Sequence, residues 1–115
     1  MRRGEIRMVD LETVRGAEAD KQRPAVIVSN DGANRSAQRL SRGVITVVPV
    51  TSNIERIYPF QVLLSAATTG LAVDSKAQAE QVRSIPVERV GGRVGVLTAE
   101  AQADLDEVLR LHLAL

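Results

Sequence analysis

The sequence of 115 residues lacks cysteine and tryptophan and contains a single histidine, His112. Without cysteine the chain has no disulfide, no thiol nucleophile, no iron–sulfur cluster and no thiolate zinc site. One histidine excludes metal sites that need several imidazoles. A Ser-His-Asp triad would have to use His112, which lies three residues before Leu115. A magnesium site made of carboxylates alone stays open.

Aromatic residues and long apolar runs are also scarce. Tyr58 and Phe60 are the only aromatic side chains, which argues against a base-stacking platform of the kind found in RRM or single-strand-binding OB domains. No run of about 18 apolar residues could span a membrane. The first residues, Met-Arg-Arg-Gly-Glu, lack the apolar stretch of a signal peptide. We therefore expect a cytoplasmic protein that does not enter a membrane.

What the chain does have is an aliphatic core. Hydrophobic residues make up 44% of the sequence, mostly valine, leucine, isoleucine and alanine. A chain of this size buries roughly 60–70% of its unfolded surface, so a stable core needs no disulfides or structural metal ions. Length and composition predict one domain over residues 1–115.

The charges are unevenly distributed although the net charge is only +1. Residues 1–60 hold ten Lys/Arg and seven Asp/Glu, and residues 61–115 hold five and seven. Arg35, Arg39 and Arg42 fall in a stretch without any acid, and thirteen of the fifteen basic residues are arginine. Arginine binds phosphate through two parallel hydrogen bonds. A general bias toward arginine explains the same composition, so both interpretations stay open.

Short apolar segments separated by turn residues predict a mostly β protein. Strands are expected over residues 4–11, 24–29, 44–50 and 60–65, with weaker alternation over 71–79 and a bulged or ending strand over 80–87. The continuous run 44–50 is the strongest and predicts burial on both faces. Residues 12–23 and 30–42 are expected to be loops. The glycine-rich segment 91–95 predicts a turn, because it lacks the lysine and context of a phosphate loop.

The period changes after Thr98, which is a suitable helix N-cap. Apolar residues then recur at helical spacing, so residues from about 99 to the C-terminus predict one amphipathic helix with an acidic solvated face. His112 lies on its apolar side and is expected to be packed or at an interface. The fold class is therefore α+β, mostly β: a small SH3-like barrel or twisted antiparallel sheet with a C-terminal helix, and not a βαβ fold.

Two polar positions at strand ends are candidate site residues. Arg23 stands where a charged loop enters a buried strand, so it lies at the sheet rim or pairs with Glu18 or Asp20. A rim arginine beside an acid is a reasonable phosphate site. Thr51 directly follows the strongest strand, where it either projects into a site or forms a turn.

The order of these motifs resembles the MazF/PemK-type toxins of bacterial toxin–antitoxin systems, which are sequence-selective endoribonucleases. The resemblance runs over nearly the whole chain. It is carried by six segments in order: Arg3-Gly4-Glu5-Ile6 with Val9-Asp10-Leu11; Gly16-Ala17-Glu18 with Arg23-Pro24-Ala25-Val26; Ser29-Asn30-Asp31 with Asn34; Val48-Pro49-Val50-Thr51-Ser52; Tyr58-Pro59-Phe60 with Val62 and Leu64-Ser65; and Gln81-Val82-Arg83-Ser84-Ile85.

The resemblance implies a homodimer that holds RNA in a groove across its interface and cleaves short single-stranded motifs without a metal or other cofactor. It also implies a cognate antitoxin whose acidic, extended C-terminal segment occupies the same groove. In metal-free cleavage the RNA 2′-hydroxyl attacks the adjacent phosphorus. That reaction needs a base, an acid and stabilisation of the phosphorane charge.

Site residues follow from the same resemblance. Arg23 is the principal catalytic residue and suits charge stabilisation, since arginine stays protonated. Thr51 hydrogen-bonds the scissile phosphate, and Glu18 is the candidate base. Further RNA contacts are expected from Asn30, Ser75 and Gln81, with general phosphate attraction from Arg35, Arg39 and Arg42.

Two positions depart from the family pattern. Arg7 stands where the family usually has an aromatic residue, and Ala17 replaces a serine beside the glutamate. These departures keep open a catalytically weakened, antitoxin-binding relative. A non-enzymatic toxin of the same architecture, as in CcdB-like proteins that bind DNA gyrase, is the other alternative, because fold alone does not decide function.

Overall fold

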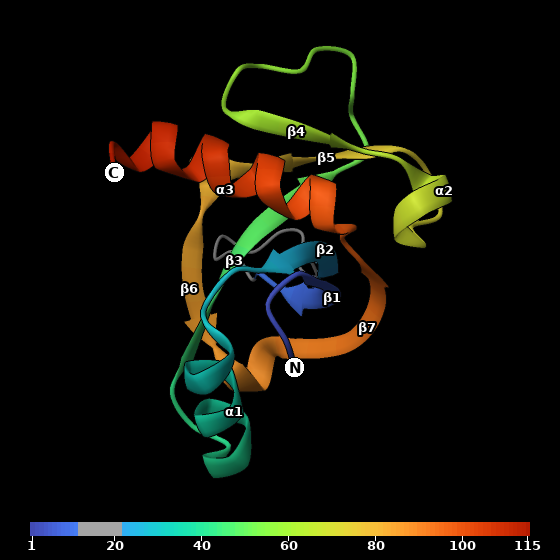
Figure 1. The fold of residues 1–115 in the computed structure, drawn as a ribbon. Coiled ribbons are helices and arrows are strands. Elements are labelled where there is room, and N and C mark those ends of the chain that lie inside the picture. Colours follow the sequence, from blue (N-terminus) through green and yellow to red (C-terminus); the bar gives the residue numbers. More distant parts are fainter. Residues whose placement is uncertain (12–21) are drawn as a thin grey trace.

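A computed structural model describes residues 1–11 and 22–115. In these ranges the elements follow the order β1 (Glu5–Asp10), β2 (Gln22–Ile27), α1 (Asp31–Leu40), β3 (Val44–Thr51), β4 (Gln61–Leu64), α2 (Ala66–Thr69), β5 (Ser75–Gln78), η1 (Ala79–Gln81), β6 (Arg83–Pro86), η2 (Val87–Arg89), β7 (Val90–Val96) and α3 (Ala99–Leu113). The strands form one antiparallel sheet (Figure 1). The predicted mostly β fold with a C-terminal helix is confirmed.

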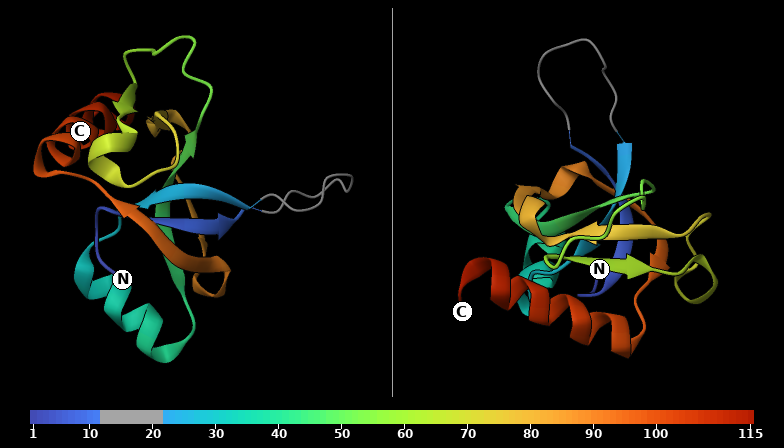
Figure 2. Two further views of the ribbon diagram at one scale, coloured as in Figure 1. Left: turned by 90° about the vertical axis from the view of Figure 1, so that its right-hand side faces the viewer. Right: turned by 90° about the horizontal axis from the view of Figure 1, so that it is seen from above.

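Strand β3 is the centre of this sheet. Along one edge it pairs with β2, and along the other it pairs first with β6 and then, near its end, with β5. The path continues through β2, β1 and β7 on one side and through β5 and β4 on the other. The sheet bends strongly between these two arms, with α3 over one end and α1 at the other (Figure 2).

Two apolar clusters fill the two faces of the bent sheet. Val26 and Val48 belong to the cluster under α3, whereas Ile27 and Val47 belong to the cluster beside α1. Successive residues of a strand point to opposite faces, so a strand between two cores is apolar throughout. This explains the continuous run of β3, in which Ile45 and residues 47–50 are buried as predicted, whereas Val44 at the start of the strand is exposed.

Helix α3 begins as the sequence predicts. The Thr98 hydroxyl accepts a hydrogen bond from the Ala101 backbone N–H at 3.0 Å, and Leu105 and Leu109 are buried against the sheet. His112 is exposed, because the last turn of α3 extends past the sheet, so of the two expected environments the one within the chain is excluded and the interface stays a prediction. No helix within the described ranges is long and apolar enough to cross a membrane.

Residues 31–40 form a helix where the sequence predicts a loop. The Asn30 side chain caps α1 by accepting from the Ala33 N–H at 2.8 Å, and the buried positions are Asn34 and Ala37. The Asn34 amide donates to the Ser29 carbonyl at 2.8 Å. The inner face of α1 is therefore held to the sheet largely by polar groups. For this reason the sequence of α1 lacks the helical repeat of apolar residues that would have predicted a helix.

The glycine-rich segment is strand β7 and not a turn. It pairs with β1, with register shifts on both sides of Arg7. The ideal Cβ of an alanine at Gly95 would lie 2.4 Å from the Thr69 carbonyl oxygen, and one at Gly91 would lie 3.0 Å from the Met8 carbonyl oxygen. Glycine is therefore needed here for close backbone approach and not for turning the chain.

Candidate functional site

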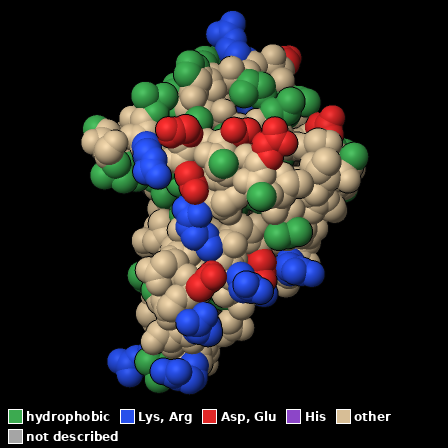
Figure 3. All heavy atoms as spheres, in the orientation of Figure 1, with side chains coloured by type: hydrophobic (Ala, Val, Ile, Leu, Met, Phe, Trp, Pro, Cys, Tyr) green, Lys and Arg blue, Asp and Glu red, His purple; other side chains and the backbone are tan. Residues whose placement is uncertain are grey.

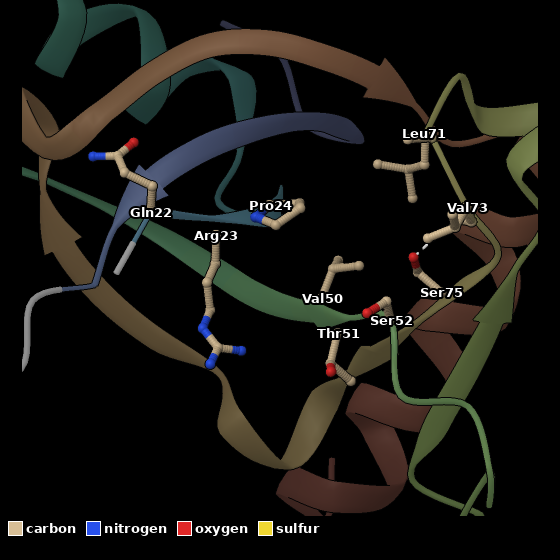
Figure 4. A pocket seen from close by; sticks show the side chains of 10 residues that line it. Gln22, Arg23, Pro24, Val50, Thr51, Ser52, Leu71, Val73 and Ser75 are labelled. Carbon is tan, nitrogen blue, oxygen red and sulfur yellow. Dashed lines mark hydrogen bonds between the residues drawn. The ribbon is translucent and has the colours of Figure 1, made fainter. Parts of the chain in front are cut away.

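A cavity of about 570 Å³ opens at the end of the sheet where β2 begins and β3 ends (Figure 4). It is lined by Gln22, Arg23, Pro24, Val50, Thr51, Ser52, Leu71, Ala72, Val73 and Ser75. The lining combines an aliphatic floor with one cation and several hydroxyl groups. Such a surface can hold an anionic group at its polar rim and an apolar ring against its floor.

Arg23 and Thr51 reach this cavity from neighbouring strands. In the β2–β3 pair Ala25 faces Pro49 and Val26 faces Val48, and the same register continued to the strand ends sets Arg23 opposite Thr51. Residues directly opposite each other in an antiparallel pair project from the same face. Figure 4 shows both side chains extending to one side, while Gln22 points away.

The hydroxyl group of Thr51 is oriented by the chain that follows it. Its Oγ1 accepts a hydrogen bond from the Asn53 backbone N–H at 3.2 Å. This bond uses a lone pair and leaves the hydroxyl proton available, so Thr51 can donate to an anion beside Arg23. Arg23 is exposed, so its guanidinium is accessible to a ligand.

Ser75 lies deeper in the same cavity. It is buried, and its hydroxyl donates to the Val73 carbonyl at 3.0 Å (Figure 4). Its oxygen is therefore left as an acceptor facing the cavity. Three of the residues predicted from the sequence, Arg23, Thr51 and Ser75, come together here.

A second group of residues, which sequence reasoning missed, adjoins Thr51. Lys76 faces Thr51 across the β3–β5 pair, is 7% exposed, and donates from Nζ to the Arg56 carbonyl at 2.7 Å. Its Nζ also lies 5.7 Å from the centre of the Tyr58 ring, which stacks on Phe60 at 5.4 Å. The two aromatic residues thus pack on each other in the β3–β4 loop. A lone lysine within a short strand was the only sequence signal for this group.

The loop is also held from its far end. The Gln61 side chain accepts from the Tyr58 N–H at 3.0 Å and donates to Glu80 at 2.9 Å. Its own backbone N–H donates to the Tyr58 carbonyl at 2.9 Å. The second half of the β3–β4 loop is therefore held to β5 through Lys76 and to η1 through Glu80.

The other predicted residues lie outside this cavity. Asn30 lines a separate cavity of about 450 Å³ between the start of α1 and the end of α3, and Gln81 is exposed at the end of η1, which packs on β3. Arg35 and Arg39 lie on α1 and Arg42 follows it, so they are remote from Arg23 along β2. Glu18 and Ala17 fall outside the described residues.

Arg7, which departs from the family pattern, forms hydrogen bonds within the sheet. Its Nε donates to Glu5 at 2.9 Å and its Nη1 donates to the Gly91 carbonyl at 3.0 Å. Burial alone raises the pKa of the Glu5 carboxyl, but the hydrogen bond and charge of Arg7 outweigh burial, so its pKa lies below the ordinary value. Arg7 therefore ties β1 to β7 and is absent from the lining of the cavity.

Comparison with known proteins identifies the family. The family model described as PemK-like, MazF-like toxin of type II toxin–antitoxin systems matches residues 2–113. The chain is 67% identical to endoribonuclease MazF9 of Mycobacterium tuberculosis over 115 residues, which cover 100% of this chain and 98% of that protein. It is 30% identical to endoribonuclease EndoA of Bacillus subtilis over 116 residues, covering 100% and 96%.

The fold agrees with these sequence relationships. A chain of the MazE–MazF crystal structure from Deinococcus radiodurans superimposes with a TM-score of 0.80 at 24% identity, covering 100% of this chain and 96% of that one. This similarity confirms the predicted fold. Together with the family model and the two relatives, it shows that the chain belongs to the PemK-like, MazF-like toxins of type II toxin–antitoxin systems.

Proposed function

We propose that this toxin is an endoribonuclease that cleaves single-stranded RNA at a short sequence motif without a metal ion, using the cavity at the ends of β2 and β3. The relatives that it matches over their whole length are endoribonucleases. The observation that carries the proposal for the site is that Arg23 and Thr51, at the adjoining ends of β2 and β3, line one cavity.

The reaction needs only groups that this chain and the RNA supply. The RNA 2′-oxygen forms a bond to the adjacent phosphorus, and the bond to the 5′-oxygen of the next nucleotide breaks. The 2′-hydroxyl proton passes to a base and the leaving 5′-oxygen takes up a proton, which gives a 2′,3′-cyclic phosphate and a 5′-hydroxyl. Charge develops on the nonbridging phosphate oxygens in between.

Arg23 binds those oxygens and stabilises the charge as it grows, because a guanidinium keeps its proton and matches a phosphate with two hydrogen bonds. Thr51 donates its free hydroxyl proton to the same phosphate. Glu18 is the proposed base. Ser75, Gln81 and Asn30 are proposed as contacts to the flanking nucleotides, whose bases pack against the aliphatic floor formed by Val50, Leu71 and Val73.

We also propose that the toxin acts as a homodimer in the cytoplasm and is inhibited by an antitoxin with an acidic, extended segment. Exposed leucines at the end of α3, with Leu111 63% and Leu115 84% exposed, support self-association through that end of the molecule. The similar structure from Deinococcus radiodurans is one of MazF together with MazE, which supports an antitoxin partner. An acidic segment would compete with RNA for Arg23.

The test is cleavage of a long RNA by the purified protein in excess EDTA, with the new 5′ ends mapped. We expect cuts at one short motif, 5′-hydroxyl products, and a loss of about 10²–10³ in rate for Arg23→Ala, the effect of removing one transition-state donor. Arg93→Ala, another exposed arginine, is the control and should cleave normally. Intact RNA under all conditions, or equal cleavage by Arg23→Ala, would contradict the proposal.

A further inference from the structure

A cluster of arginines at the far end of the molecule has no role in the cavity. Arg35 and Arg39 lie one turn apart on α1, and Arg42 directly follows the C-cap Ser41. All three are exposed, and none makes an ion pair within the described part of the chain. We call these three residues the α1 patch.

The α1 patch contains no compensating acid. From Gly32 to Ile54 the sequence has no Asp or Glu, and the Asp31 carboxylate accepts from the Arg3 backbone N–H at 2.7 Å and forms no ion pair with the patch. Glu88 shares a cavity with Gln38 and Ser41 but forms no ion pair with the patch. Like charges one turn apart destabilise a helix by themselves, so the patch suits an external polyanion.

The face of the molecule drawn in Figure 3 shows the same polarity. Figure 3 shows Lys and Arg side chains gathered at its lower end, over α1, and Asp and Glu side chains in a row over α3. A polyanion that approaches the molecule is therefore drawn toward α1 and repelled from α3.

Helix α1 holds the patch in a fixed place. Asn34 is fully buried and donates to the Ser29 carbonyl at 2.8 Å, and its side-chain oxygen pairs with the Ser29 hydroxyl. The Ser29 hydroxyl in turn accepts from the Thr46 N–H of β3 at 3.1 Å. These bonds lock α1 to β3, so the arginines hold a defined position relative to the cavity.

The α1 patch and the cavity lie at opposite ends of β3. This strand begins at Val44, two residues after Arg42, and ends at Thr51, which at 3.3 Å a residue is a span of about 25 Å. Between them Arg83, which faces Val47 across the β3–β6 pair, is exposed and adds a further cation on the face of β3 that carries Thr51. An RNA strand seated at Thr51 can follow this surface to α1.

We propose that the α1 patch binds phosphates of the substrate RNA several nucleotides away from the bond that is cut, so that long RNA is bound more tightly than the bare cleavage motif. This inference rests on the proposed ribonuclease function and adds to it a second, sequence-independent contact. Phosphate contacts of this kind give affinity but carry no sequence information. The patch therefore affects binding of long RNA and not the choice of motif.

The experiment compares wild type with R35Q/R39Q/R42Q. Binding is measured over a range of salt concentrations on a long RNA from which the mapped motif has been removed, and kcat/KM is measured on that motif within a long RNA and within a short oligonucleotide. We expect the slope of log affinity against log salt to shrink by about 2, three contacts at about 0.7 each. kcat/KM should fall about tenfold on long RNA at low salt and stay unchanged on the oligonucleotide.

Two controls accompany the triple variant. R35K/R39K/R42K keeps the charges and should retain most of the binding, and Arg93→Gln removes one exposed charge from β7, outside the patch. An equal loss on both substrates, or no loss on long RNA, overturns the inference. If the triple variant binds RNA normally but no longer binds an acidic antitoxin peptide, the patch belongs to a protein partner, and the inference is also overturned.

The binding measurement separates this inference from the proposed function. If the wild type cleaves RNA and the triple variant binds long RNA equally well, the second contact is wrong and the ribonuclease function stands. If the wild type binds long RNA but cleaves none, and the triple variant has lost the salt-dependent part of that binding, the cleavage proposal fails and the contact surface stands.

Discussion

Arg23 and Thr51 stand opposite each other when the register of the β2–β3 pair is continued to the strand ends, although 27 residues and helix α1 separate them in the chain. Their side chains leave the same face of the sheet at the rim of one cavity (Figure 4). A cation and a hydroxyl donor set side by side can bind two oxygens of one phosphate. This relationship depends on strand register, because a slip of one residue would turn one side chain to the opposite face.

Two substitutions of Thr51 distinguish the role of its hydroxyl group from that of its branched side-chain shape. We expect Thr51→Val, which keeps the branched side chain, to lower kcat about 10- to 100-fold because a hydrogen bond to a charged group contributes roughly 1.5–3 kcal/mol. Thr51→Ser keeps the hydroxyl and should retain most of the rate. Single-turnover cleavage of an RNA that contains the mapped motif measures both. Equal rates for the valine and serine variants would remove Thr51 from the reaction.

Lys76 should fix the β3–β4 loop. In Lys76→Met the Arg56 carbonyl loses its donor and Tyr58 loses the nearby charge, so we expect a loss of about 1–2 kcal/mol in stability. Backbone amides in residues 52–60 should exchange faster with deuterium, while those of α3 should not. Lys76→Arg keeps a charged donor and is the matched control. Unchanged exchange in the loop would show that Lys76 does not hold it.

Close backbone contact at β7 predicts opposite results for two glycines. Gly95→Ala places a Cβ 2.4 Å from the Thr69 carbonyl oxygen, so it should lower the free energy of unfolding by about 1–3 kcal/mol. An alanine Cβ at Gly92 has no heavy atom within 4 Å, so Gly92→Ala should be neutral or slightly stabilising. Urea unfolding measures both. A pair of variants with the same midpoint would mean that β7 does not approach Thr69 as described.

Stability should depend on the ionisation of Glu5. Its folded-state pKa lies below the ordinary value because Arg7 outweighs the effect of burial. A lowered folded-state pKa means that the stabilisation is complete above the unfolded-state pKa and is lost as the pH falls through the folded-state pKa. Glu5→Gln should therefore be less stable than wild type at neutral pH, and the difference should shrink on acidification. Glu100→Gln, at an exposed residue, is the control, and a constant difference would contradict this assignment.

The elements that the sequence predicts well share one property: their signal is carried by neighbours in the chain. The run 44–50 reports a strand between two cores, and Thr98 with the apolar period after it reports α3. The elements that it predicts wrongly depend on distant groups. Helix α1 is secured by Ser29 and Thr46, and β7 owes its glycines to the Met8 and Thr69 carbonyls.

The same distinction applies to the site. The sequence alone determined which chemistry is open to the protein. Without cysteine, and with one histidine that the structure shows to be exposed, its candidate catalytic groups are guanidinium, hydroxyl and carboxylate groups. Sequence resemblance also selected Arg23, Thr51 and Ser75. Only the tertiary structure decided that these three meet in one cavity, that Lys76 stands beside Thr51, and that the α1 arginines lie at the other end of β3. Those placements follow from strand register and helix docking, which arise from contacts between residues far apart in the chain.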